Sequence, residues 1–322
     1  LVLGFLGQLS LGHCGFMAIG AYTAALMSLA FQRAGVYDEK SGAVFIAIIF
    51  LCIIAAGLLA AVIGAVVSIP ALRLKGDYLA IITLGFGLII VNVINNLPFA
   101  GQNGLAEGSA SASLYATGLG FGTAAKVTYI WAALLVTIVC IVLMFMFIRS
   151  KYGRAIRAIR NDEIAASAAG INTSYYKVLT FSFSAFFAGV AGALYACANA
   201  SLSTSSFSFT NGGILNSTFV VVMVVLGGMG SLTGSIFSAV IMYVLNYQIK
   251  NGAWVSALPG FLQGVFTYPM LVYALVLVVI IIFRPKGIFG SYEFSLTGLA
   301  SSLAAKLRGS KKSAAKEAAQ HE

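Results

Sequence analysis

The chain contains 322 residues, of which 60% are hydrophobic and 9% are charged, whereas charged residues make up about 25% of a typical soluble domain. A soluble domain of this length cannot cover so much apolar surface with polar groups, which excludes a secreted scaffold, a disordered chain and an ordinary cytosolic enzyme. The net charge of +10 is compatible with nucleic acid or an anionic surface as a partner, and the positions of the charges decide between them.

Apolar stretches predict an all-α polytopic membrane protein with about eight transmembrane helices, since a crossing needs about 20 apolar residues. The stretch 43–69 is longer than required and is expected to tilt. The pair 214–228 and 231–247 is short and interrupted by glycines, so it forms either two tight helices or a re-entrant pair. The eight stretches are 11–31, 43–69, 77–97, 127–148, 176–199, 214–228, 231–247 and 267–283.

The basic residues predict the orientation. If the eight stretches alternate in direction, fourteen of the 19 Lys and Arg residues share one side, and the positive-inside rule makes that side cytoplasmic. The C-terminal tail is then cytoplasmic, and nucleic-acid binding is disfavoured. The fourteen are Arg73, Lys75, Arg149, Lys151, Arg154, Arg157, Arg160, Arg284, Lys286, Lys306, Arg308, Lys311, Lys312 and Lys316.

The acidic residues and cysteines predict neither a catalytic site nor a metal site. None of the nine Asp and Glu residues lies inside an apolar stretch, although Asp77 opens one, so carboxylate relays for protons or sodium are disfavoured. The four cysteines form no C-x-x-C pair, and the chain has no P-loop for a nucleotide. Energy for uphill transport is therefore expected from a partner.

The loop 150–175 contains a candidate docking helix. Asn161 or Asp162 is expected to cap its start, Glu163 suits the positive end of its dipole, and Gly170 suits its C-terminal end. So short a helix is marginal in water and needs a surface to pack against. Its exposed face is predicted to be small, comprising Ala165, Ala166, Ala168 and Ala169.

The segment before this helix has two interpretations. Ile156 and Ile159 lie among the arginines 154, 157 and 160, a pattern that suits an amphipathic strip on anionic lipid head groups. The other interpretation is a docking site for a cytoplasmic subunit.

Two adjacent patterns carry a resemblance to a known family. The first is R-A-I-R-x-x-E-x-A-A-x-x-x-G-I, and the second, F-x-x-S-A-x-x-A-G-x-A-G-A-L, opens the next span. The patterns fall on Arg157, Glu163, Ala165, Ala166, Gly170 and Ile171, then on Phe181, Ser184, Ala185, Ala188, Gly189, Gly192, Ala193 and Leu194. With further similar blocks at 7–22, 72–78, 226–231 and 284–287, the chain to about residue 290 resembles the bacterial ABC permeases for branched-chain amino acids, the LivM type.

The resemblance implies one permease of an ATP-driven importer in the bacterial inner membrane. Its partners would be a second homologous permease, two cytoplasmic ATPase subunits that use ATP and Mg²⁺, and an external solute-binding protein; this chain would bind no cofactor. The transmembrane domain would comprise 1–290 with the coupling loop 150–175, followed by the tail 291–322, and further helices are expected before Leu1. The residues implied in coupling are Arg157, Asn161, Asp162, Glu163, Ala165, Ala166, Gly170 and Ile171.

The implied cargo is Leu, Ile and Val. An importer of urea or short amides with the same architecture is the first alternative. The second is an ion-coupled carrier or channel acting alone, which the missing intramembrane acids disfavour.

Two glycine-rich interruptions, 7–15 and 227–235, are candidates for the substrate path, because broken spans with small polar residues often mark it. Their loose likeness hints at an internal repeat. The alternative is that the glycines only let helices pack closely, as the spacing of Gly230 and Gly234 allows. For the histidine, hydrogen bonding within the protein and a pH-dependent role both stay open. The candidate path residues are Gln8, Ser10, His13, Ser231 and Thr233.

Overall fold

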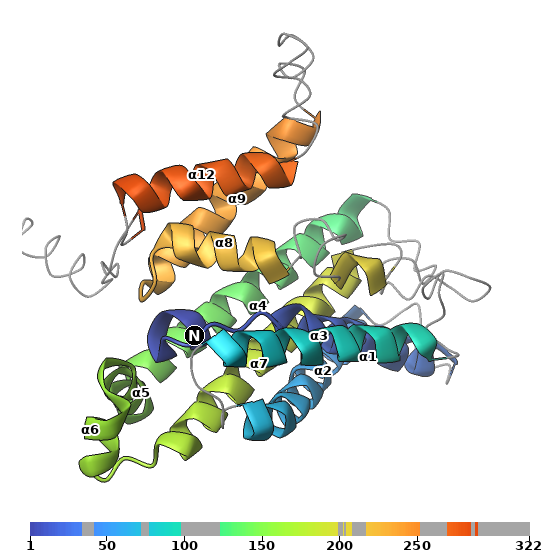
Figure 1. The fold of residues 1–322 in the computed structure, drawn as a ribbon. Helices are drawn as coiled ribbons and strands as arrows, with labels where there is room; N and C mark the ends of the chain where they lie inside the picture. Colours follow the sequence, from blue (N-terminus) through green and yellow to red (C-terminus); the bar gives the residue numbers. More distant parts are fainter. Residues whose placement is uncertain are drawn as a thin grey trace, which may run out of the picture.

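The computed structural model describes residues 1–33, 42–71, 77–97, 123–198, 202, 204–207, 217–251, 269–284, 287 and 288, and this part of the chain contains helices and no strands. Figure 1 shows a bundle of α1, α2, α3, α4 and α7, with α5 and α6 at one end and α8, α9 and α12 grouped beside it. The elements are η1 (Val2–Leu6), α1 (His13–Arg33), α2 (Gly42–Ala71), α3 (Asp77–Asn96), α4 (Thr123–Arg149), α5 (Lys151–Asn161), α6 (Glu163–Ala168), α7 (Thr173–Ala198), η3 (Thr204–Phe207), α8 (Ser217–Gly227), α9 (Leu232–Asn251) and α12 (Pro269–Phe283).

Each of the eight apolar stretches overlaps one of these helices. Within the described residues, six helices are long and apolar enough to cross a membrane, namely α1, α2, α3, α4, α7 and α9. Helix α8 has 11 residues and therefore extends about 16 Å, roughly half the hydrocarbon thickness. The prediction of an all-α polytopic membrane protein is confirmed.

The outward faces of the bundle are apolar, as contact with lipid requires. Large aliphatic side chains are exposed on α2, α4 and α9, among them Leu58, Val62, Val66, Leu135, Ile138, Met146, Val240 and Val244.

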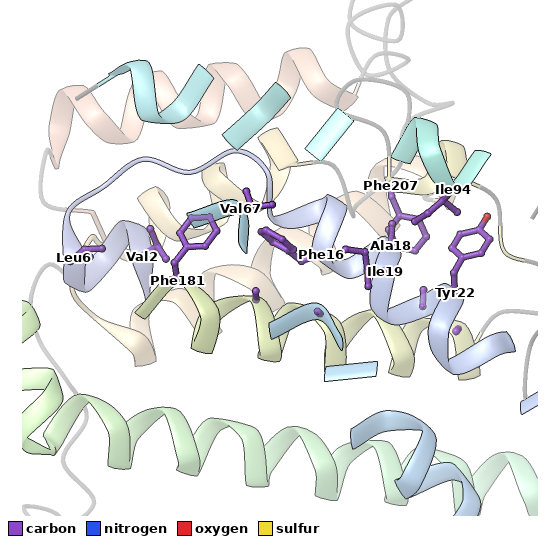
Figure 2. Packing of buried hydrophobic residues seen from close by; sticks show 14 of the residues in the cluster. Val2, Leu6, Phe16, Ala18, Ile19, Tyr22, Val67, Ile94, Phe181 and Phe207 are labelled. Carbon is purple, nitrogen blue, oxygen red and sulfur yellow. The ribbon is translucent and has the colours of Figure 1, made fainter. Parts of the chain in front are cut away.

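Small residues bring the backbones of α1 and α7 close together. A Cβ on Gly20 would lie 2.1 Å from the carbonyl oxygen of Gly189, and one on Gly192 would lie 2.0 Å from that of Met17. Below this contact, Phe16 of α1 and Phe181 of α7 meet edge to face with ring centroids 5.8 Å apart (Figure 2). Because lipid is as apolar as the core, such close packing holds membrane helices together. Gly189 and Gly192 are therefore packing glycines.

Helices α8, α9 and α12 have a core of their own, centred on Phe219, Met242 and Tyr273. The α8–α9 turn contains Gly228 and Gly230 with φ of 111° and 109°, values that L side chains rarely adopt. A Cβ on Gly227 would lie 2.5 Å from the carbonyl carbon of Gly234, so α8 and α9 are two separate helices joined by a tight turn.

Several expectations concern residues outside the described part. These are the basic residues Arg73, Lys75 and Lys286, the proposed boundary at residue 290 and the tail 291–322.

Candidate functional site

Helix α5 turns back from the end of α4 and packs onto the start of the chain. The Ser150 hydroxyl caps α5 by accepting a bond of 3.2 Å from the Tyr152 amide. Ile156 and Ile159 are 2% and 5% exposed and belong to the core cluster that also contains Phe5. These are the two apolar side chains that a lipid-facing strip requires, and the protein buries both. The head-group interpretation therefore loses its apolar face.

Helix α6 is capped at both ends, as its sequence predicts. The Asp162 Oδ1 accepts bonds of 2.8 Å from the Ile164 amide and 3.0 Å from the Ala165 amide. At the other end, Gly170 has φ of 83°, and the Ile171 amide donates to the Ala166 carbonyl at 3.0 Å, a Schellman arrangement. Of the two candidate caps, Asp162 makes these bonds, whereas Asn161 is the last residue of α5.

The exposed surface of α6 differs from the predicted alanine face. Ala166 is 5% exposed and packs into the core cluster, so its assignment to the exposed face is wrong. Ala165, Ala168 and Ala169 are exposed as predicted. Ile164, which the predicted alanine face did not include, is 80% exposed and is the large apolar side chain among these alanines.

An ion pair joins α6 to α7. The Lys177 Nζ lies 2.6 Å from the Glu163 Oε1, with side chains 6% and 38% exposed. A buried ammonium is costly without such a partner. The two residues are 14 positions apart in the sequence, so no local pattern signalled the pair. Through this pair and the burial of Ala166, α6 is fixed to the base of α7.

Two arginines of α5 bind backbone carbonyls. Arg157 donates from Nη2 to the Ile148 carbonyl at 3.0 Å and lies over the Phe5 ring, 6.0 Å from its centroid. Arg160 donates from Nη1 to the Gly4 carbonyl at 2.5 Å. Helix α5 is thus connected to α4 and to η1.

Ser10 and His13, two of the candidate path residues, lie in one hydrogen-bond network. The His13 Nδ1 is 3.1 Å from the Ser10 Oγ, and its Nε2 is 2.9 Å from the Ser184 Oγ on α7. Hydrogen bonding within the protein therefore accounts for both ring nitrogens. Gln8 is different, because its Oε1 is buried and has no hydrogen-bond partner in the described part of the chain.

The candidates of the second interruption, Ser231 and Thr233, lie at the start of α9. Ser231 is 1% exposed, and its hydroxyl accepts a bond of 3.0 Å from the Gly234 amide, so it acts as the N-cap of α9. Thr233 Oγ1 lies 3.1 Å from the Ser231 Oγ. The element η1, which precedes the first interruption, approaches the second, since a Cβ on Gly4 would lie 3.2 Å from the Gly230 amide nitrogen.

Comparison with known proteins agrees with this architecture. A family model described as "Branched-chain amino acid transport system / permease component" matches residues 1–283. The LivM branched-chain amino acid permease protein of Escherichia coli (strain K12) is 33% identical over 307 residues, which cover 89% of this chain and 65% of that protein. The LivH permease protein of Salmonella typhimurium (strain LT2) is 26% identical over 315 residues, covering 91% of this chain and 89% of that protein.

A more distant similarity extends to an archaeon. The probable LivM permease protein of Methanocaldococcus jannaschii is 22% identical over 252 residues, covering 76% of this chain and 68% of that protein. No solved structure matches the chain. The chain spans 65% of the length of the Escherichia coli and Salmonella typhimurium LivM proteins. The matched family model covers most of the chain, and the chain therefore belongs to the family of permease components of branched-chain amino acid transport systems.

Proposed function

We propose that the chain forms the membrane path of an ATP-driven importer for branched-chain amino acids. The observation that carries the proposal is helix α6, which is capped at both ends, fixed to α7 and exposes Ile164. An exposed apolar side chain on a short, firmly held helix suits docking on another protein. Membership of a permease family makes an energy-supplying subunit a fitting partner.

In this proposal, α6 docks on one of two cytoplasmic ATPase subunits, which bind ATP and Mg²⁺. Closure of the ATPase pair pushes α6, and the Glu163–Lys177 pair passes that movement to α7. The coupling residues are those of the capped helix and its flanks, Arg157 and 161–171. The chain then lies in the bacterial inner membrane with α6 and the C-terminus in the cytoplasm.

The similar proteins support the second permease among the remaining partners. Both LivM and LivH are permease proteins of high-affinity branched-chain amino acid transport systems, so we propose a second, homologous permease beside this chain. An external solute-binding protein delivers Leu, Ile or Val. Ser10, His13 and Gln8 lie along the substrate path in this account, whereas Ser231 and Thr233 shape the start of α9.

The test is reconstitution of the purified complex with its binding protein in proteoliposomes. With ATP on the α6 side, the complex is expected to accumulate labelled leucine, and omission of ATP or of the binding protein is expected to abolish accumulation. Accumulation of urea or a short amide in place of leucine would show that the cargo is not a branched-chain amino acid. Transport by this chain alone, driven by an ion gradient, would overturn the proposal of an ATP-driven importer.

A further inference from the structure

Arg160 lies where three distant segments of the chain meet. Its Nη1 donates to the Gly4 carbonyl of η1 at 2.5 Å. The same nitrogen lies 3.0 Å from the position of a Cβ on Gly230, in the α8–α9 turn. Its Cγ lies 3.0 Å from the position of a Cβ on Gly7, in the loop before α1. The Arg160 side chain of α5 therefore lies beside both glycine-rich interruptions, at Gly7 in the first and at Gly230 in the second.

Gly7 and Gly230 lie beside Arg160, and neither has a side chain that would collide with it. Gly7 and Gly230 have φ of 72° and 109°, so an L side chain at either position would be strained. It would also press against the arginine at 3.0 Å. The close approach of Gly4 to Gly230, 3.2 Å from a Cβ position to the amide nitrogen, brings η1 and the α8–α9 turn together beside the arginine.

Arg160 is also closely connected to α6. It occupies the last turn of α5, and Asp162 both ends α5 and caps α6. A displacement of α6 therefore reaches the arginine through a single linking residue. The guanidinium has several donors in a rigid planar group, and its bonds to carbonyl oxygens are charge-assisted. Although the residue as a whole is exposed, the bond to the Gly4 carbonyl is partly buried.

We propose that Arg160 is a positioning residue that links movement of α6 to both glycine-rich interruptions, an inference that rests on the importer function proposed above. The bond to the Gly4 carbonyl holds η1 against α5, and the same guanidinium lies against the α8–α9 turn at Gly230. When α6 moves, both interruptions move with it or are released together. The Glu163–Lys177 pair carries movement to α7, so Arg160 provides a second, separate connection to α1 and α9.

The experiment compares three variants of the complete complex in proteoliposomes. Arg160→Ala removes the link, Arg160→Lys keeps one charged donor, and Arg149→Ala removes an exposed arginine at the end of α4, outside the loop 150–175, as a control. Two quantities are measured, the amount of ATPase subunit that co-purifies and the substrate taken up per ATP hydrolysed. Loss of stability alone would lower the yield of complex and leave uptake per ATP unchanged.

Arg160→Ala is expected to retain the ATPase subunit and to lower uptake per ATP about tenfold, in line with loss of one charge-assisted hydrogen bond. Arg160→Lys is expected to recover part of the loss, and Arg149→Ala to match the unsubstituted complex. Equal uptake per ATP in Arg160→Ala and Arg149→Ala would overturn the inference. Failure of the unsubstituted complex to couple uptake to ATP would instead overturn the proposed function, and with it this inference.

Discussion

The Lys177 ammonium lies 2.6 Å from the Glu163 carboxylate and connects the first turn of α6 to the second turn of α7. The lysine side chain is almost fully buried, at 6% exposed, whereas the glutamate is 38% exposed. The pair is therefore asymmetric: the lysine depends on the glutamate for its only ion-pair partner in the described residues. If α6 moves away from α7, this ion pair must break or rearrange.

This asymmetry predicts unequal effects of the two single substitutions. Glu163→Ala leaves a buried ammonium unpaired and is expected to destabilise the protein by roughly 2 kcal/mol, less than for a fully buried pair because the glutamate is partly exposed. Lys177→Met leaves a carboxylate that water reaches and is expected to cost less. Thermal unfolding in detergent measures both. Equal losses, or a larger loss for Lys177→Met, would contradict the role of the lysine as the dependent partner.

The caps of α6 predict where the helix frays. Asp162→Ala removes two bonds to backbone amides and is expected to cost about 1 kcal/mol locally. That loss speeds hydrogen exchange at the amides of Ile164 and Ala165 by about fivefold. Asn161→Ala is the matched control, because Asn161 ends α5 and does not cap α6. Similar exchange rates in the two variants would show that Asp162 does not hold the helix start.

The different burial of two neighbouring alanines predicts different outcomes for one substitution. Ala166 is 5% exposed, so Ala166→Leu overpacks the core and is expected to cost about 1–3 kcal/mol. Ala165 is exposed, so Ala165→Leu is expected to keep the melting temperature and to reduce co-purification of the ATPase subunit by crowding the α6 surface. A stable Ala166→Leu variant would contradict the burial, and unaltered co-purification with Ala165→Leu would count against docking at this surface.

Gln8 and Ser231 are expected to separate into a substrate-path residue and a cap. Ser231→Ala removes the cap of α9 and is expected to cost about 1 kcal/mol while leaving the KM of uptake unchanged. Gln8→Ala removes a buried acceptor that has no partner in the described residues, so stability is expected to hold. The KM for leucine is expected to rise, because the proposed function places Gln8 along the substrate path. Unchanged kinetics with Gln8→Ala would remove it from the path.

Features that depend on local sequence were predictable. Apolar stretches marked all eight helices, and the six helices that are long enough to cross a membrane have the length that the bilayer requires. Asp162 and Gly170 marked the ends of α6, because capping needs only a side-chain oxygen or a positive φ at one position. Ser231 also precedes a helix, so its cap could have been predicted by the same reasoning.

Features that depend on distant contacts were not predictable. The burial of Ala166 follows from where α6 lies against the core, and periodicity in a helix of six residues cannot define a buried face. The bond from Arg160 to Gly4 joins residues 156 positions apart, and no spacing rule links them. The sequence shows Arg154, Arg157 and Arg160 as a group before α6. The fold determines that Arg157 binds the Ile148 carbonyl and Arg160 the Gly4 carbonyl.

Cross-linking from position 164 tests the central claim, that α6 docks the ATP-hydrolysing subunit. Ile164→Cys places a thiol on the exposed α6 surface, and Asn96→Cys places one at the exposed far end of α3 as a control. In the purified complex, labelled at the introduced thiol with benzophenone maleimide and irradiated, we expect Ile164→Cys to cross-link to the ATPase subunit and Asn96→Cys not to do so. A complex that retains the ATPase subunit but yields no product from position 164 would contradict docking at α6.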